Sequence, residues 1–404
     1  MKILFLTDNF PPEVNAPATR TYEHVTDWIK KGAVVTVVTG VPNFPHGQPY
    51  FGYTNSFYKK EGIAGIDVRR VWSYMAKNEG FAKRILDYIS FGLSSSIAGL
   101  FIKADVIVAT SPQFFTAVAG FILSKIKRRP WIFELRDLWP ESIKAVGAMR
   151  NQFLLRMLER IELFLYRDAD LVIALTKAFK ENLVSRGISA DTIVVIPNGS
   201  NLELFYPRKK DTALVRELGI QRKFVVGYLG THGMAHGLRF IAEAAAKVKS
   251  KNIHFLFVGD GAEKKRVQAA AMEKRLRNMT FLNPVPREDV PRYLSIMDVA
   301  LVNLKKDPAF TAVLPSKIFE AAAMGKPILL GVDGEARRVV EQYAAGLFFE
   351  PENETAFLAA IDRMRKDQKL YSRFEKGCAE LARAFDRTVL SEKMLECLKN
   401  VVRR

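Results

Sequence analysis

The chain has 404 residues, of which 49% are hydrophobic, and this size and composition exclude both a single small domain and a disordered protein. Lysine and arginine number 61 against 43 aspartate and glutamate residues, a formal net charge of +18 at pH 7. Such a charge predicts an anionic partner. Nucleic acid, phosphorylated metabolites and an anionic membrane surface all meet that requirement, and the charge alone does not choose among them.

Three features of the chain bear on its compartment. The two cysteines, Cys378 and Cys397, lie in helical sequence and form no ligand cluster, which favours a reducing cytosol. Met1 and Lys2 lead directly into an apolar strand, so we expect no secretory signal. Residues 85–102 carry one charge, but glycine and serine dilute their apolar character, so we expect a buried or surface-lying helix and not a membrane span.

Short apolar runs alternate with helical patterns along the chain. In the first half we expect strands at residues 3–7, 34–39, 68–72, 105–110, 131–136, 171–176 and 193–197. In the second half we expect them at 224–230, 253–259, 279–282, 299–304, 327–332 and 346–349, before a helical end. This alternation predicts an α/β fold with two doubly wound, Rossmann-like domains of parallel strands.

A linker is predicted where Ile196-Pro197-Asn198-Gly199-Ser200 precedes a basic, turn-rich run at 206–210. We therefore place the first domain at residues 1–200 and the second at 207–385. A final helix, about residues 386–404, is expected to pack back on the first domain. Because ligands of open α/β sheets bind beyond the carboxyl ends of the strands, we expect the site in a cleft where the two domains face each other.

The first strand is followed by a long loop, residues 8–20, which has rigid prolines and then small residues. It contains no G-x-G-x-x-G, so the nicotinamide or flavin fingerprint is missing. A small-residue loop can admit a bulky substrate, and a purely structural turn explains it equally well. Arg20 fits a phosphate ligand or, as we prefer, a solvated helix residue.

After the fifth strand, charged residues interrupt an apolar run. A pair formed by Arg136 and Asp137 at a cleft edge is a functional candidate, and a structural ion pair is the alternative. The triplet from Asp168 to Asp170 matches a D-x-D metal pattern, but a turn between helix and strand explains it better.

The second domain opens with a strand and a glycine-rich turn, Gly230 to Gly237, that contains His232 and His236. Backbone amides of such a turn can contact phosphate. Zinc is disfavoured because neither cysteine is near and no H-E-x-x-H is present, so we expect no metal site. The Gly259-Asp260-Gly261 turn is a weaker candidate of the same type.

Leu314 to Pro327, with the sequence LPSKIFEAAAMGKP, runs into an apolar strand. Ser316 can cap a short helix whose free amides and positive dipole end favour an anion. Glu320 lies one turn further on, where its carboxylate can accept hydrogen bonds from ribose hydroxyls. The segment thus suits a sugar nucleotide, although an ordinary capped helix between two strands shows the same pattern.

Basic and apolar residues are mixed in three segments of the first domain, 81–89, 125–129 and 150–167. Attachment to an anionic membrane surface explains this mixture. Core-facing helices with solvated basic backs explain any one segment almost as well.

Together these residues resemble the retaining family-4 glycosyltransferases of GT-B architecture, over essentially the whole chain. The resemblance rests on the first strand and loop, Ile196-Pro197-Asn198-Gly199, the turn from Val258 to Gly261, and Glu320 with Ala323-Met324-Gly325-Lys326-Pro327. Within the family, residues 8–13, 42–45, 136–141 and 230–233 look like the subgroup of colanic-acid and O-antigen transferases that includes N-acetyl-L-fucosamine transferases.

The resemblance implies roles for particular residues. It places the donor ribose on Glu320 and the reacting sugar near Arg136 and Asp137, which occupy the family's His-Asp position. The donor diphosphate would lie at a helix end and two loops, formed by Pro315, Ser316, Lys317, Gly230, Thr231, His232, His236, Gly259 and Asp260. The acceptor and phosphate loop would include Asn15, Ala16, Arg20 and Asn198.

Three departures from the family pattern stand out. The family's first glutamate, which grips the donor sugar, is Ala312 here. The usual Arg and Lys of the loop after the second domain's first strand are Thr231 and His236. Neutralisation of the diphosphate therefore falls to Lys317 or His236.

The resemblance implies transfer of an N-acetylated amino or deoxyamino sugar from a UDP-sugar to a polyprenyl-diphosphate-linked glycan in surface polysaccharide synthesis. It implies no cofactor or metal, no protein nucleophile, and a cytoplasmic enzyme attached peripherally to the cell membrane. A UDP-sugar epimerase of the same architecture and a basic nucleic-acid-binding protein are the rivals. Against the latter, we find no aromatic-basic recognition motif, helix-turn-helix or zinc finger.

Overall fold

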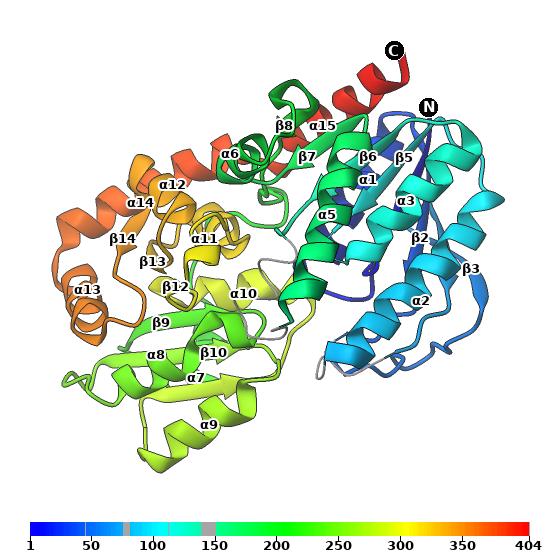
Figure 1. The fold of residues 1–404 in the computed structure, drawn as a ribbon. Coiled ribbons are helices and arrows are strands. Elements are labelled where there is room, and N and C mark those ends of the chain that lie inside the picture. The colour runs from blue at the N-terminus through cyan, green and yellow to red at the C-terminus, as the bar shows by residue number, and fades with distance from the viewer. Residues whose placement is uncertain (45, 76–80, 112, 139–150, 404) are drawn as a thin grey trace. The chain divides into compact units, whose positions relative to one another are not determined.

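The computed structural model describes residues 1–44, 46–75, 81–111, 113–138 and 151–403, and these form two compact units. Unit 1 comprises Met1–Pro197 with Thr388–Arg404, and unit 2 comprises Asn198–Arg387. In each unit, helices cover a mostly parallel sheet (Figure 1). The predicted α/β class is therefore confirmed.

Unit 1 contains an eight-stranded sheet in the order β3-β4-β2-β1-β5-β6-β7-β8. Its strands are β1 (Lys2–Leu6), β2 (Val34–Gly40), β3 (Tyr58–Ile63), β4 (Ile66–Val71), β5 (Val106–Thr110), β6 (Trp131–Leu135), β7 (Leu171–Ala174) and β8 (Ile193–Val195). Its helices are α1 (Ala16–Lys30), α2 (Phe81–Leu100), α3 (Phe114–Lys127), α5 (Gln152–Asp168), α6 (Lys177–Ser185) and α15 (Arg387–Arg403).

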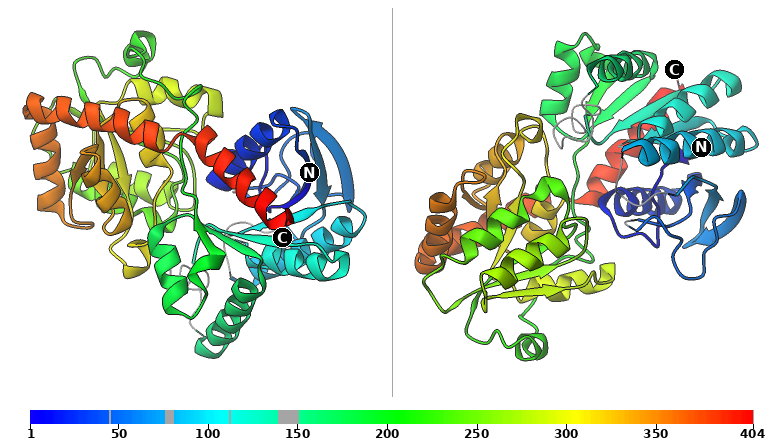
Figure 2. Two further views of the ribbon diagram at one scale, coloured as in Figure 1. Left: turned by 90° about the horizontal axis from the view of Figure 1, so that it is seen from above. Right: turned by 60° about the horizontal axis from the view of Figure 1, so that its bottom comes forward.

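Opposite faces of this sheet carry different helices, because neighbouring residues of a strand point to opposite sides. Val108 and Ile132 belong to a core that includes Trp28 of α1 and Leu398 of α15. The Trp28 indole also donates to the Ser391 carbonyl at 3.0 Å, so α15 packs beside α1 (Figure 2). On the other face, α3 abuts Ala109 and Trp131 through Gly120, and Tyr166 of α5 contacts the ring of Phe133.

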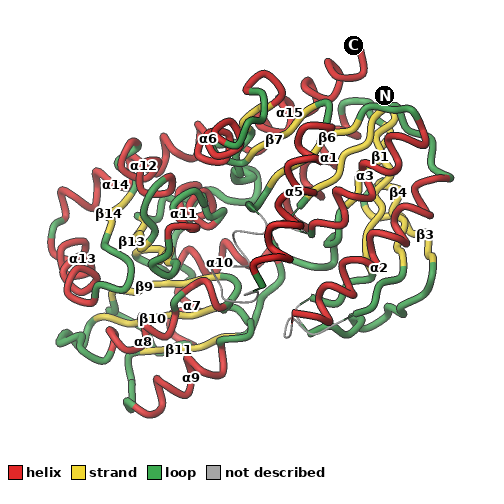
Figure 3. The backbone as a smooth tube through the Cα atoms, in the orientation of Figure 1, coloured by secondary structure: helices red, strands yellow, loops and turns green. Residues whose placement is uncertain are grey.

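Unit 2 contains a parallel six-stranded sheet in the order β11-β10-β9-β12-β13-β14. Its strands are β9 (Phe224–Leu229), β10 (Ile253–Val258), β11 (Met279–Leu282), β12 (Val299–Asn303), β13 (Ile328–Gly331) and β14 (Gly346–Phe348). Its helices are α7 (Thr212–Glu217), α8 (Leu238–Ala245), α9 (Lys264–Glu273), α10 (Val290–Ser295), α11 (Lys317–Ala323), α12 (Glu335–Gln342), α13 (Glu354–Lys366) and α14 (Gln368–Ala384). Figure 3 shows the regular alternation of strand and helix.

Every predicted strand is present, with ends that differ by one or two residues. One strand was missed: β3 pairs antiparallel with β4 across a turn in which Ala64 and Gly65 have φ of 50° and 82°. The D-x-D triplet is the predicted turn, because α5 ends at Asp168 and β7 begins at Leu171. Residues 352–403 form helices, as predicted.

Candidate functional site

In the sheet of unit 2 the order of successive strands reverses between β9 and β12. These two strands are hydrogen-bonded neighbours although they are far apart in sequence. At such a switch point the loops after the two strands diverge and leave room for a ligand. The loop after β9 begins at Gly230. The side-chain amide (Nδ2) of Asn303, at the end of β12, donates to the backbone carbonyl of His236 at 2.8 Å. The glycine-rich turn predicted to hold phosphate therefore lies at the switch point.

Two glycine turns are hydrogen-bonded to each other beside this point. The Gly230 amide donates to the Val258 carbonyl at 2.9 Å, and the His232 amide donates to the Asp260 carbonyl at 2.7 Å. Gly259 has φ +144°, and a Cβ there would lie 1.9 Å from the Gly230 carbonyl oxygen. Close backbone approach thus explains the G-D-G sequence, while the Asp260 carboxylate accepts from the Gly261 amide at 2.8 Å.

The side chain of Lys317 lies against this turn. Gly230 has φ +133°, which favours glycine, and a Cβ there would be 2.8 Å from the Lys317 Nζ, so a larger residue would push the ammonium aside. The Nζ lies 5.1 Å from the centroid of the Tyr228 ring and has no hydrogen-bond acceptor among the described residues. Burial lowers the pKa of Lys317 to about 8, against a smaller opposing effect of Glu320. A partly buried charge without an acceptor among the described residues favours an anionic ligand.

The two histidines of the turn are neutral near pH 7. Burial, followed by the nearby Lys264, lowers the pKa of His232 to about 4. Burial, followed by Lys317, lowers the pKa of His236 to about 3. His232 is fully buried against the rings of Tyr228 and Phe257, and neither ring nitrogen has a hydrogen-bond partner among the described residues. Of the two predicted candidates for neutralising a diphosphate, the geometry favours Lys317 over His236.

Glu320 lies on α11, one turn beyond Lys317, and is mostly buried. Its Oε1 accepts from Arg287 Nη1 at 2.6 Å, and the Arg287 guanidinium also lies 4.7 Å over the Phe205 ring. Arg287 thereby fixes the carboxylate, and Oε2 has no donor among the described residues. The sequence analysis missed Arg287, which is 33 residues away in an unremarkable turn.

Ser316 does not cap α11 as predicted. It occupies the cap position, but its backbone is already helical, with φ −59° and ψ −26°, and its side chain makes no capping hydrogen bond. Instead its carbonyl accepts from the Phe319 amide at 3.1 Å, and the Pro315 carbonyl accepts from the Ile318 amide at 3.2 Å. The Thr231 carbonyl likewise has a partner, the Tyr228 hydroxyl at 2.6 Å.

Unit 1 holds the remaining predicted residues, and Arg20 is the clearest correction. It is not solvated: only 1% of its side chain is exposed, and its Nε contacts Glu134 Oε1 at 2.8 Å. Its other nitrogens donate to the carbonyls of Ile196 and Pro197 at 3.2 and 2.8 Å. These contacts tie α1 to the end of unit 1, a structural role that neither sequence interpretation included.

The other residues predicted for the acceptor and phosphate loop are Asn15, Ala16 and Asn198. Asn15 caps α1 by accepting from the Ala18 amide at 3.0 Å, and Ala16 is the first helical residue. Asn198 is buried at the start of unit 2.

Arg136 and Asp137 follow β6 and are partly buried. Arg136 donates through its amide to Ser111 Oγ at 2.8 Å and through Nη1 to the Pro17 carbonyl at 3.2 Å. The pKa of the buried Tyr166 is raised well above its ordinary value, by burial first and then by Glu162, with Asp137 a smaller cause. Residues 139–141 of the same motif lie outside the described residues.

A carboxylate cluster after β1 was also missed. Burial raises the pKa of Asp8 well above its ordinary value, and the neighbouring Asp87 adds to the shift. Burial raises the pKa of Glu13 to about 7, although the amides of Phe44 and Asn43 each donate to it at 2.9 Å. Asp8 and Glu13 belong to the same loop, whereas Asp87 lies on α2, and only the fold brings its charge within range of Asp8.

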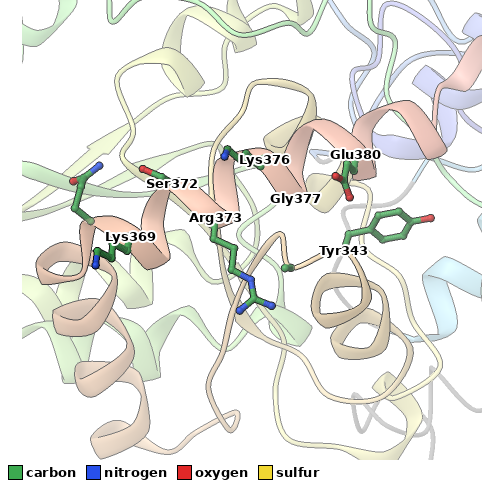
Figure 4. Close-up of a pocket in the computed structure, with 9 residues that line it drawn as sticks. Tyr343, Lys369, Ser372, Arg373, Lys376, Gly377 and Glu380 are labelled. Carbon is green, nitrogen blue, oxygen red and sulfur yellow. The ribbon is translucent and has the colours of Figure 1, made fainter.

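A separate hollow of about 590 Å³ lies along α14 (Figure 4). It is lined by Tyr343, Ala344, Gln368, Lys369, Ser372, Arg373, Lys376, Gly377 and Glu380. Its charged side chains are exposed, and none of its residues belongs to the turn around Lys317. It lacks a partly buried charge like that of Lys317.

Comparisons with known proteins agree with this geometry. Residues 15–199 match the model of the glycosyl transferase 4-like domain, and residues 211–380 match that of the glycosyl transferases group 1. WcaI of Escherichia coli K12, by name a colanic acid biosynthesis glycosyl transferase, is 27% identical over 373 residues, which cover 89% of this chain and 91% of WcaI.

Two solved structures resemble the whole chain. Sucrose-phosphate synthase from Thermosynechococcus elongatus matches with a TM-score of 0.80 at 18% identity, over 99% of this chain and 98% of that one. HepE of Anabaena, in complex with UDP-glucose, matches with a TM-score of 0.75 at 20% identity, over 99% of this chain and all of HepE. The chain therefore belongs to the group 1 and 4-like glycosyl transferases and is a glycosyltransferase of the GT-B fold.

Proposed function

We propose that this enzyme is a retaining glycosyltransferase that moves a sugar from a UDP-sugar to a polyprenyl-diphosphate-linked glycan during surface polysaccharide synthesis. The observation that carries the donor site is the partly buried Lys317 ammonium, which lies beside Gly230 without an acceptor among the described residues, one helical turn from Glu320. An ammonium and a carboxylate at this spacing match the diphosphate and the ribose of a nucleotide sugar. HepE, which shares the fold, was solved in complex with UDP-glucose, and this supports uracil as the base.

The catalytic contribution is electrostatic. As the glycosidic bond breaks, negative charge grows on the departing diphosphate, and a preorganised cation in a water-poor site stabilises that charge strongly. Lys317 supplies the cation, so the proposed mechanism needs no metal. The acceptor hydroxyl attacks the face that the diphosphate leaves, and a donor phosphate oxygen takes its proton, so no protein side chain acts as nucleophile.

The acceptor and the sugar follow from the resemblance and from the relatives. WcaI is named for colanic acid biosynthesis, and its similarity spans nearly the whole chain, which supports a glycan acceptor in polysaccharide assembly. Within that group we propose an N-acetylated amino or deoxyamino sugar, with N-acetyl-L-fucosamine as the first to test. A polyprenyl-linked acceptor requires work at a membrane surface. No described helix is both long and apolar enough to span a bilayer, and peripheral attachment is the form we propose.

Calorimetric titration of UDP, GDP, dTDP and ADP tests the donor site. We expect selective binding of UDP by the wild type and an affinity at least about tenfold lower in Glu320→Ala, on the order of 1.4 kcal/mol. Glu320→Gln is the matched control for structure, since its amide oxygen can still accept from Arg287. Absence of nucleotide binding by the folded wild type would reject the proposed site.

A second experiment separates transfer from epimerisation. UDP-sugars labelled in the sugar are incubated with and without polyprenyl-diphosphate-linked glycans. Transfer moves the label into the lipid fraction and releases UDP only when acceptor is present. An epimerase would convert the labelled UDP-sugar with no acceptor, and that result would replace the proposed reaction.

Asp137 is proposed to orient the reacting groups. We expect Asp137→Asn to lower turnover by at least about tenfold while UDP affinity stays within about twofold, because the contribution arises in the transition state. Calorimetry and a label-transfer assay on the same preparation measure both quantities. Unchanged turnover with normal nucleotide binding would remove Asp137 from the mechanism.

A further inference from the structure

Three helices of unit 1, α2, α3 and α5, form one layer over a single face of the sheet. Figure 1 shows them side by side, and α3 contacts both of the others. Their inward residues pack on the strands, as Gly120 of α3 does on Ala109 and Trp131. Their outward residues would be expected to be polar, as on an ordinary surface helix.

The outward side of α2 is instead apolar. Leu86, Ile89, Leu93, Ile97 and Leu100 recur every three or four residues and are all exposed, Ile97 to 62%. The inward side of the same helix is apolar or small as well, since Phe91, Gly92, Ala98 and Gly99 are buried. Phe101, directly after the helix, is 84% exposed. The helix thus has two apolar sides, and the sheet covers only one of them.

Helix α5 repeats this pattern. Phe153, Met157, Ile161 and Phe164 form a second exposed stripe at helical spacing, with Phe153 73% exposed. Phe164 contacts the ring of Phe121 on α3 at 5.2 Å, so the stripe of α5 continues onto α3. We call the outward side of α2, α3 and α5 the helical face. Its apolar residues are Leu86, Ile89, Leu93, Ile97, Leu100, Phe101, Ile126, Phe153, Met157, Ile161 and Phe164.

Asp170, just after α5, is exposed, but the other exposed charges of the described residues on and beside the helical face are positive. They belong to Lys83, Lys103, Lys125, Arg128, Arg129, Arg156, Arg160 and Arg167. Of the acidic residues on the three helices, none is in the exposed class: Glu162 is buried, Asp168 pairs with Lys125 at 2.7 Å, and Glu159 pairs with Arg186 at 3.2 Å. The face therefore combines protruding apolar side chains with an excess of positive charge.

This combination identifies the partner. Protruding leucine, isoleucine and phenylalanine side chains can enter the acyl boundary of a bilayer, while lysine and arginine contact anionic headgroups. Two copies of this chain meeting through the same face would oppose like charges, which disfavours self-association. We infer that the helical face docks unit 1 on an anionic lipid surface. This inference rests on the peripheral attachment proposed above, to which it assigns a surface of unit 1, and it does not depend on the donor site in unit 2.

Flotation of the full chain with vesicles of neutral phosphatidylcholine, with or without phosphatidylglycerol, tests the inference without any substrate. We expect binding to the anionic vesicles only, and weaker binding at high salt because exposed charges are screened. The double variant Ile97→Asn/Phe153→Asn should reduce the bound fraction by at least about tenfold, since both side chains lie on the helical face. Phe51→Asn/Met272→Asn is the matched control: both residues are exposed, neither is on the face, and binding should persist.

Circular dichroism and thermal unfolding establish that each variant is folded before it is compared. Absence of binding by the wild type to anionic vesicles would overturn the inference, as would equal loss in both double variants. Gel filtration at the same protein concentration tests the alternative that a second copy of this chain binds the helical face. A wild-type dimer that Ile97→Asn/Phe153→Asn converts to a monomer would show that a second copy covers the face instead of lipid.

Discussion

If Lys317 binds the donor diphosphate as proposed, we expect it to cost stability in the free protein and to strengthen binding in the complex. Its pKa is near 8 in the folded chain against 10.5 when unfolded, so at pH 7 the ammonium is charged in both states and the full penalty for its burial is present. We expect Lys317→Met to raise the thermal midpoint of the unligated protein by about 2 °C or more and to weaken UDP binding at least tenfold. Differential scanning calorimetry and titration measure the two effects. Lys265→Met, at an exposed lysine on α9, should change neither.

The same pKa predicts the pH dependence of donor binding. Above about pH 8 the free enzyme loses the Lys317 charge, so UDP must bind with uptake of a proton, and its affinity should fall as pH rises from 8 to 10. In Lys317→Arg the cation persists over this range, and the affinity should stay nearly level. Isothermal titration at several pH values in two buffers of different ionisation enthalpy checks both the affinity and the proton uptake. A wild-type affinity that is flat across this range would exclude Lys317 as the diphosphate cation.

Residues whose role is local were predictable from the sequence, and residues with distant partners were not. The P-S-K-I-F-E segment marked Lys317 and Glu320 because both belong to one short helix. Arg287 escaped notice because the fold alone brings it to Glu320. Arg20 was placed in solvent because its partner, Glu134, is 114 residues away. Ser316 has the right residue type for a cap, but its helical backbone precludes the capping geometry.

Among the elements, the paired turns after β9 and β10 hold the candidate donor loop in place. In Gly259→Ala the new Cβ would meet the Gly230 carbonyl, and alanine would also have to adopt φ near +144°. We expect a loss of about 1–3 kcal/mol of stability and weaker UDP binding, because the turn beside Lys317 must shift. Chemical denaturation and titration measure these effects.

Gly62→Ala is the control for that substitution. Gly62 lies in β3, where no atom is within 4 Å of the position of an added Cβ. The free energy of unfolding of the Gly62→Ala protein should therefore differ from that of the wild type by no more than about 0.5 kcal/mol. Comparable effects of the two substitutions would argue against the close-approach explanation of Gly259.

Buried parallel strands were the easiest strands to predict from the sequence, and the exposed strand β3 was the hardest. β5, β6 and β10 are buried at every position and are mostly apolar, with Glu134 and His254 as the ionisable exceptions. β3, with the sequence YKKEGI, is exposed or partly exposed throughout and has no apolar face to detect. Its turn uses Ala64 and Gly65 instead of Asn-Gly, so the usual hairpin signal is also missing.

On the scale of the whole molecule, the two units should respond to pH in opposite directions. In unit 1, burial raises the pKa of Glu13 to about 7 and that of Asp87 to about 6, so the folded unit retains protons that the unfolded chain has lost. Its stability therefore falls as pH rises from about 4.5 to 7. In unit 2, burial lowers the pKa of His232 and His254 to about 4, so the unfolded chain binds protons first. Its stability falls as pH drops from about 6.5 to 4.

The sequence supplies a probe for one unit alone, because all four tryptophans, Trp28, Trp72, Trp131 and Trp139, belong to unit 1. Urea denaturation followed by tryptophan fluorescence reports unit 1, and far-UV circular dichroism reports both units. On lowering the pH from 7 to 5, we expect the fluorescence midpoint to rise and a second transition, seen only by circular dichroism, to move to lower urea. Glu13→Gln should flatten the first dependence and leave the second unchanged, since it removes a titrating group from unit 1 only. A fluorescence midpoint that falls on acidification would mean that the buried carboxylates of unit 1 are ionised in the folded state, with Glu13 held by the amides of Asn43 and Phe44 as an anion.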